Sequence, residues 1–200
     1  MLNIKRTTSA IILLLATACS HTQTPATKYS FPQVGWTMYL PASFKVLDSA
    51  KNAALNENGK KAMEDANNIK ADFSGLKTLV SAMKDQTNYF SSTIKAYDPK
   101  REGPYATTNQ VVKSVLYTTF KQKAPNAKID TGSSQLAIDG VTFDRFYLLL
   151  TLNNKMVIHM IVLAKFYKGY DFGITYLYTD EESKTELESI LKTSKFSLHP

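Results

Sequence analysis

The segment IDGVTFDRFYLLLTLNNKMVIHMIVLAKFYKGYDFGITYLY, residues 138–178, decides the fold, because short turn sequences divide it into apolar stretches. The turns hold Asp139-Gly140, Asn153-Asn154 and Lys168-Gly169, and such pairs favour the tight turns of β-hairpins. With the residues just before it, the segment predicts an antiparallel meander of four strands, at Ala127–Ile138, Val141–Leu152, Met156–Phe166 and Tyr170–Tyr178.

The last of these strands carries an aromatic stripe. Side chains alternate between the two faces of a strand, so one face bears Tyr170, Phe172, Ile174, Tyr176 and Tyr178. A face of this kind either packs beneath a helix, which is the more common arrangement, or lines a groove for a small molecule. The sequence leaves both interpretations open.

Alternation also predicts strands elsewhere in the chain. Trp36, Met38 and Leu40 occupy alternate positions, which indicates a half-buried strand that ends at Pro41. A lone tryptophan in such a pattern is expected in the core rather than as a platform for a ligand. Further short strands are predicted at residues 44–47, 87–97 and 194–198.

Helices are predicted between these strands. Residues 48–70, rich in Ala, Asn and Lys, are expected to form a partly helical excursion with breaks at Gly59 and Asn67-Asn68. Apolar residues at helical spacing predict a second helix, with Asp72 or Ser74 as its N-cap. Those apolar residues are Phe73, Leu76, Leu79, Val80 and Met83.

Two more helices are indicated by capping sequences. Thr107 and Gln110 have the spacing of a capping box, and Pro125 ends the helix that follows. The apolar face of that helix consists of Val111, Val112, Val115, Leu116 and Phe120. Thr179 and Glu182 form a second such box, before a helix with the inward residues Leu187, Ile190 and Leu191.

The order of these elements predicts an α+β fold, an α/β/α sandwich whose central antiparallel sheet has helices on both faces. The chain resembles PsbP-like domains, and most closely the small bacterial lipoproteins of that class. The residues that carry the likeness are Phe31-Pro32, Gly35-Trp36-Thr37, Leu40-Pro41, Asn88-Tyr89-Phe90, residues 138–143, residues 168–174 and Ser194-Lys195-Phe196. The resemblance implies the same sandwich fold. It transfers no catalytic residue, because the superfamily shares no catalytic motif.

The N-terminal segment has the pattern of a secretory signal. Lys5 and Arg6 precede an apolar run of nine residues, Ala10–Ala18, which is too short to span a bilayer, since a spanning helix needs about 20 apolar residues. Cys19, the only cysteine, follows this run directly. It has no second cysteine with which to form a disulfide within the chain. No histidine in a segment expected to fold lies near it to support catalysis, and the chain lacks the ligand spacing of a metal site.

Ala16-Thr17-Ala18-Cys19 instead resembles the lipobox of bacterial lipoproteins. The resemblance implies a diacylglycerol on Cys19, cleavage before it and palmitate or a similar chain on the freed amine. Two or three acyl chains anchor a protein far more firmly than one. Ser20 follows Cys19, and under the sorting rule of enterobacterial lipoproteins this implies the outer membrane. The expected organisation is a signal peptide at 1–18, a flexible lipid tether at 19–28 and one domain at 29–200.

Composition and charge narrow the class of protein. Hydrophobic residues make up 44% of the chain and aromatic residues 11%, as in globular proteins. The net charge is +7, and without Lys5 and Arg6 it is +5. Nucleic-acid binding usually requires clustered Arg and Lys, but the exported part has only Arg101 and Arg145 among scattered lysines. We therefore expect no nucleic-acid partner and a weak preference for anionic surfaces.

Sequence motifs for catalysis or cofactor binding are not found, and we predict no cofactor and no metal site. A serine hydrolase would need His159 to meet Ser133 or Ser134 and an acid. Asp180-Glu181-Glu182 is explained more simply by a helix N-terminus than by calcium.

Two functional hypotheses follow. The first is a non-enzymatic, lipid-anchored envelope protein that binds or assists another envelope component, with the membrane as a partner through Cys19. The second is a small-ligand carrier or an enzyme that uses a cleft beside the aromatic sheet face, where polar groups would have to converge. The oligomeric state is left open by the sequence.

Overall fold

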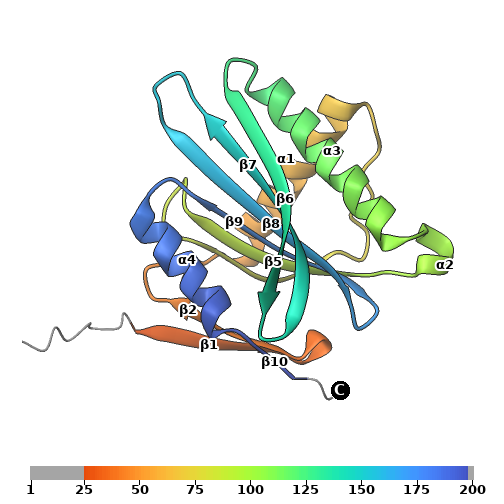
Figure 1. Cartoon of the computed structure of the whole chain (residues 1–200), viewed down its shortest axis with the longest axis vertical. Helices are drawn as coiled ribbons and strands as arrows, with labels where there is room; N and C mark the ends of the chain where they lie inside the picture. Colours follow the sequence, from red (N-terminus) through yellow and green to blue (C-terminus); the bar gives the residue numbers. More distant parts are fainter. Residues whose placement is uncertain (1–24, 198–200) are drawn as a thin grey trace, which may run out of the picture.

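The computed structural model describes residues 25–197, and its centre is a seven-stranded antiparallel sheet (Figure 1). The four predicted meander strands are four neighbouring strands of these seven, so the meander is confirmed. Asp139 (φ +46°) and Gly140 (φ +82°) both have the positive φ values that a tight hairpin turn requires. In spatial order the strands are β3 (Lys45–Val46), β4 (Lys77–Met83), β5 (Tyr89–Ala96), β9 (Tyr170–Tyr178), β8 (Val157–Tyr167), β7 (Val141–Thr151) and β6 (Lys128–Ile138).

A second, three-stranded sheet lies below the first in Figure 1 and consists of β1 (Ala26–Phe31), β2 (Trp36–Pro41) and β10 (Lys195–Phe196). β2 is the central strand and pairs antiparallel with both neighbours. A single 3-10 turn, η1 (Pro32–Val34), joins β1 to β2 and ends at Gly35. Gly35 has φ +60°, and a Cβ there would lie 2.8 Å from the carbonyl oxygen of Ser197, so the turn requires glycine.

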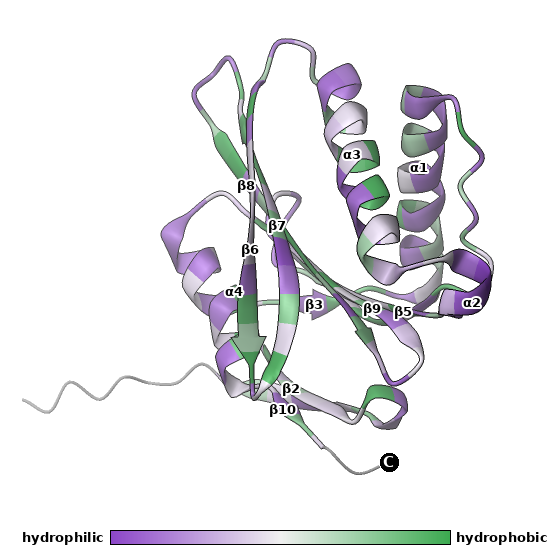
Figure 2. Ribbon diagram, turned by 45° about the vertical axis from the view of Figure 1, so that its right-hand side comes forward, coloured by the Kyte–Doolittle hydropathy of each residue, from purple (hydrophilic) through white to green (hydrophobic). Residues whose placement is uncertain are grey.

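Helices cover both faces of the seven-stranded sheet, as Figure 2 shows, and the α/β/α sandwich is confirmed. α1 (Ser49–Asn67) and α3 (Tyr105–Lys123) pack against each other on one face, with the short α2 (Pro99–Glu102) leading into α3. α4 (Glu181–Thr193) lies on the other face with the three-stranded sheet. No helix within residues 25–197 is long and apolar enough to cross a membrane.

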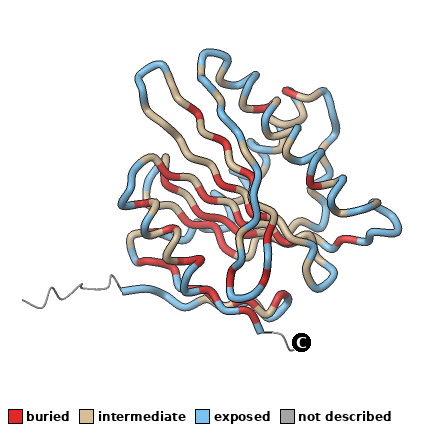
Figure 3. The backbone as a smooth tube through the Cα atoms, in the orientation of Figure 1, coloured by how far each residue is buried: buried red, intermediate tan, exposed pale blue. Residues whose placement is uncertain are grey.

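The main core lies between the two sheets and α4, where Figure 3 shows a concentration of buried positions. Trp36 is fully buried at its centre, and its ring packs against Phe31, Phe172 and Phe196. Its indole Nε1 donates a hydrogen bond of 3.0 Å to Ser194 Oγ. Trp36 is therefore a core residue, as expected, and offers no platform to a ligand.

One predicted helix is wrong. Residues 77–83 form β4, which pairs with β3 and β5. The register shifts between Thr78 and Val80, so an irregularity interrupts the alternation that would have marked a strand. The helical spacing of the apolar residues around Leu79 and Val80, which are adjacent in sequence, is therefore a coincidence.

Both long helices differ from their predicted limits. α1 is continuous through Gly59, capped by Asp48, whose side chain accepts from the Lys51 amide, and it ends at Asn68 in the left-handed region. α3 begins at Tyr105 after Pro104, so Thr107 lies inside the first turn and does not cap it. On α3, Val111 and Val112 are exposed rather than packed.

Residues 26–28, placed in the tether by the sequence, belong to β1, whose first residue Ala26 pairs with Pro41, so the domain begins before the predicted Tyr29. Cys19 and the signal segment lie outside the described residues.

We expect Trp36→Phe to lower the free energy of unfolding by about 1–3 kcal/mol, because Ser194 Oγ loses its buried donor. Trp36→Ala should cost about 3–5 kcal/mol through the cavity it leaves. Denaturant unfolding of a soluble form that starts at Ser20 measures both. Tyr39→Ala, an exposed position on the same strand, is the matched control and should change little.

Candidate functional site

The aromatic stripe of β9 is mostly packed. Phe172, Ile174, Tyr176 and Tyr178 are buried on the face that α4 covers. This confirms that the stripe is a packed sheet face along most of its length. A cavity opens beside it only at the edge of α4.

That cavity has a volume of about 320 Å³ and lies between α4 and the β6–β7 hairpin. Its walls combine an apolar part, formed by Leu136, Ile138 and Leu191, with a set of polar groups. The polar and charged lining residues are Asp139, Arg145, Tyr176, Glu188 and Lys192. We call this space the Arg145 cavity.

Arg145 is the unusual member of this set. It lies on β7 with the residues that face α4, and its Nε atom is buried without a hydrogen-bond partner. No ion pair to its guanidinium is found among residues 25–197, although Glu188 lines the same cavity. A half-buried cation without a counter-ion is costly unless something else compensates it.

The other charged groups of the cavity are already engaged. Asp139 accepts from Lys195 Nζ (2.9 Å) and from the Phe196 amide (2.7 Å). Glu188 and Lys192 pair with each other across one turn of α4 at 3.7 Å. Arg145 therefore remains as the uncompensated charge.

Tyr176 forms the floor of the cavity. Burial raises the pKa of its hydroxyl well above the usual value, and Glu188 raises it further while Arg145 lowers it. The hydroxyl is therefore neutral at physiological pH and able to donate a hydrogen bond. No hydrogen bond of this hydroxyl is found within the described part of the chain, so it is available to a ligand.

The structure does not bring the residues of the serine-hydrolase alternative together. His159 on β8 stacks on Tyr178, with ring centroids 4.5 Å apart. Burial lowers the pKa of its imidazole, and the positive charge of Lys184 lowers it further. Ser134 lies opposite Arg145, four residues along the sheet from His159 with β7 between them. Ser133 faces the α3 side and accepts from Lys113 Nζ at 3.3 Å.

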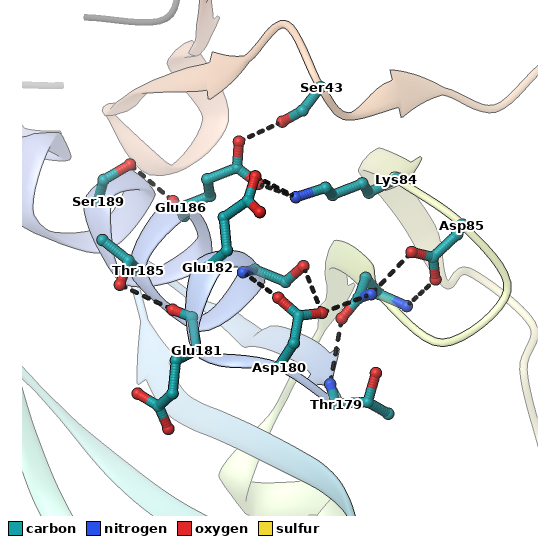
Figure 4. A network of polar contacts seen from close by, with 12 residues as sticks. Ser43, Lys84, Asp85, Thr179, Asp180, Glu181, Glu182, Thr185, Glu186 and Ser189 are labelled. Atoms are coloured by element: carbon teal, nitrogen blue, oxygen red, sulfur yellow. Dashed lines mark hydrogen bonds and ion pairs between the residues drawn. The ribbon is translucent and has the colours of Figure 1, made fainter.

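The acidic run Asp180-Glu181-Glu182 has a structural role (Figure 4). Asp180, not Thr179 as predicted, caps α4 by accepting from the Ser183 amide at 2.7 Å. The buried Asn88 donates to Asp180 (3.2 Å) and accepts from the Thr179 amide, which holds the start of α4 against β5. No group of three or more potential metal ligands is found among residues 25–197.

Two further ion pairs complete this network. Lys84 Nζ lies 3.0 Å from Glu182 and 2.9 Å from Glu186, and Ser43 Oγ donates to Glu186. Asp180, Glu182 and Glu186 are thus bound to the β4–β5 hairpin through Asn88 and Lys84, whereas the exposed Glu181 pairs with Lys184 on α4 itself.

A smaller cavity of about 160 Å³ lies between α3 and the opposite sheet face. Its charged residue, Asp171, accepts from the Tyr105 hydroxyl at 2.6 Å, and burial raises the pKa of its carboxyl. Because this carboxyl already has a partner, the Arg145 cavity is the better candidate for ligand binding. Sequence reasoning pointed to a cleft beside the aromatic face but did not identify Arg145.

Comparison with known proteins supports the fold. No family model matches the sequence, and no curated protein matches it. The solution structure of cyanobacterial PsbP (CyanoP) from Synechocystis sp. PCC 6803 matches with a TM-score of 0.54 and 11% identity, over 92% of this chain and 99% of that one. A crystal structure from Bacteroides thetaiotaomicron VPI-5482 matches with a TM-score of 0.43 and 11% identity, over 86% of this chain and 48% of that one. The match to CyanoP confirms the PsbP-like fold.

We expect Asp180→Ala to lower the free energy of unfolding by about 1 kcal/mol at neutral pH, the usual cost of losing an N-cap. The Ser183 amide holds the pKa of Asp180 below its usual 3.8. The charged cap therefore stabilises the fold fully above about pH 4 and is lost as the pH falls through the lower folded value. The difference between wild type and variant should shrink below about pH 4.

Denaturant titrations across this pH range measure that difference. Glu181→Ala, a neighbour whose side chain is 84% exposed, is the control and should change stability by less than about 0.5 kcal/mol. A difference for Asp180→Ala that stays constant into acid would contradict the capping role of the ionised carboxylate.

Proposed function

We propose that this chain is a non-enzymatic, lipid-anchored protein of the cell envelope whose domain binds a small amphipathic anion in the Arg145 cavity. The observation that carries the proposal is Arg145 itself, an unpaired cation on the wall of a cavity whose other charges are satisfied. An anionic group is the partner that would remove the cost of this charge. Leu136, Ile138 and Leu191 would contact an apolar tail.

A carboxylate or phosphate would interact with Arg145 and accept a hydrogen bond from Tyr176. The guanidinium presents its donors in a planar fork that suits such two-oxygen groups. The cavity volume of about 320 Å³ suits a ligand of modest size, such as a medium-chain fatty acid or a comparable envelope metabolite. In this proposal the envelope component that the domain serves is the anionic ligand.

The envelope location is supported by the sequence before the domain. The apolar run ending at Ala18, followed by Cys19 and Ser20, has the form of a lipoprotein signal and sorting site. Within residues 25–197 no helix could supply an alternative membrane span. In this proposal the acyl chains on Cys19 attach the protein to the membrane, and Ser20 favours the outer membrane where the enterobacterial sorting rule applies.

We expect Cys19→Ala to abolish incorporation of labelled palmitate and to leave the protein unprocessed or outside the membrane fraction. Labelling, gel mobility and membrane fractionation measure this. Ser20→Ala, at the adjacent position, is the control and should keep the label. Normal membrane retention of Cys19→Ala would overturn the proposed anchor.

Octanoate is a suitable probe of ligand binding. Octylamine and octanol are its controls, because they have the same apolar tail with a positive charge and with no charge, respectively. Titration calorimetry should detect octanoate binding to the wild-type domain. Arg145→Gln should weaken it by about 10- to 100-fold, the usual range for losing a hydrogen bond to a charged group. Arg101→Gln is the matched control, because Arg101 is exposed on α2 and is the other arginine of the exported chain.

Stability separates a binding role from a structural role. Because Arg145 has no partner in the fold, Arg145→Gln should leave the free energy of unfolding unchanged or raise it. A clear loss of stability would mean that Arg145 supports the fold instead. Equal binding of octanoate and octylamine would also contradict the proposed anion site.

A further inference from the structure

The outer face of the three-stranded sheet is exposed and basic. Cross-strand partners share a face, and the register pairs Lys28 with Tyr39 and Thr37 with both Ser30 and Lys195. The alternate residues of β2 point the other way, into the core. We call the set Lys28, Ser30, Thr37, Tyr39 and Lys195 the outer β1–β2–β10 face.

This face contains no acid. The three strands ATKYSF, WTMYLP and KF hold no Asp or Glu. Lys28 forms no ion pair within the described part of the chain, and the Lys195 side chain is 70% exposed although it pairs with Asp139. Tyr39, on the same face, is 39% exposed to solvent. Lysine and tyrosine are residues that favour the interface of an anionic membrane.

The position of this face in the chain brings it close to Cys19. β1 begins at Ala26, seven residues after the proposed lipid. Seven residues span at most about 25 Å, whatever their conformation. β7 alone has 11 residues, or about 36 Å of strand. The far end of the meander, at the top of Figure 1, thus lies well away from β1 at the bottom.

We propose that the outer β1–β2–β10 face lies against the anionic surface of the membrane that holds the lipid. This inference rests on the lipid anchor of the proposed function. Lys28 and Lys195 meet the acidic headgroups, and Tyr39 enters the interface between them. The turn at residues 153–155, between β7 and β8, points away from the membrane.

The anchor and the face act together. Two lysines and one tyrosine bind a membrane too weakly to hold a free protein. A short tether keeps the face at a high effective concentration near the headgroups, so weak contacts suffice to orient the domain. The domain without lipid should therefore not bind vesicles. In the tethered domain the outer β1–β2–β10 face should bind the membrane surface reversibly and should dissociate from it in high salt.

Lysine modification can test the orientation without depending on lipidation in cells. The chain from Cys19 onward, with its single thiol coupled to a maleimide-bearing phospholipid, attaches to vesicles of phosphatidylcholine with or without phosphatidylglycerol. An amine-reactive acetylating reagent then reports the exposure of each lysine by mass spectrometry. Lys155, exposed in the distal turn, is the internal control for Lys28.

On vesicles with phosphatidylglycerol, acetylation of Lys28 should slow several-fold relative to the untethered protein, while Lys155 reacts at an unchanged rate. High salt should remove the protection. Equal rates for tethered and untethered Lys28, or protection of Lys155, would overturn the proposal. If Cys19→Ala still incorporates palmitate, the natural lipid anchor is overturned instead. Failure of the anchor and failure of the docking face are therefore distinguishable.

Discussion

The packing of Trp36 between the two sheets is the constraint on which the rest of this structure depends. Its ring contacts Phe172 of the large sheet and Phe196 of β10, so three segments remote in sequence meet at one side chain. The hydrogen bond to Ser194 adds a directional requirement, because Ser194 follows the last turn of α4 and also donates to Ile190. The three-stranded sheet, α4 and β9 are thereby held in one arrangement.

This arrangement determines where a ligand can bind. The centre of the α4 face is filled with aromatic side chains and has no room for a guest. Space remains only at the border of α4, where Arg145 and Tyr176 line a cavity. A half-buried guanidinium without a partner departs from the rule that charges removed from water are paired, and such exceptions concentrate at functional sites.

Sequence reasoning succeeded where local chemistry determines structure. The meander follows from turn residues that accept positive φ, such as Asp139-Gly140, and from regular alternation. It failed at β4, where a register irregularity near Leu79 hides the strand, and at α1, where Gly59 lies in open space and costs too little to break the helix. The Arg145 cavity could not be predicted from the sequence, because the lack of a partner for the guanidinium is apparent only from the three-dimensional structure.

The surroundings of Arg145 make that last point concrete. Asp144 is its neighbour in sequence but points to the other face of the sheet, where it accepts from Asn109. Asp139 lines the same cavity as Arg145 but is bound by Lys195 and the Phe196 amide. Lys195 in turn belongs to the face proposed to meet the membrane, so one ion pair joins that face to the rim of the cavity. Both oxygens of Asp139 are thus engaged, Oδ1 by Lys195 and Oδ2 by the Phe196 amide, so Asp139 is already bound and the charge of Arg145 is left for a ligand to compensate.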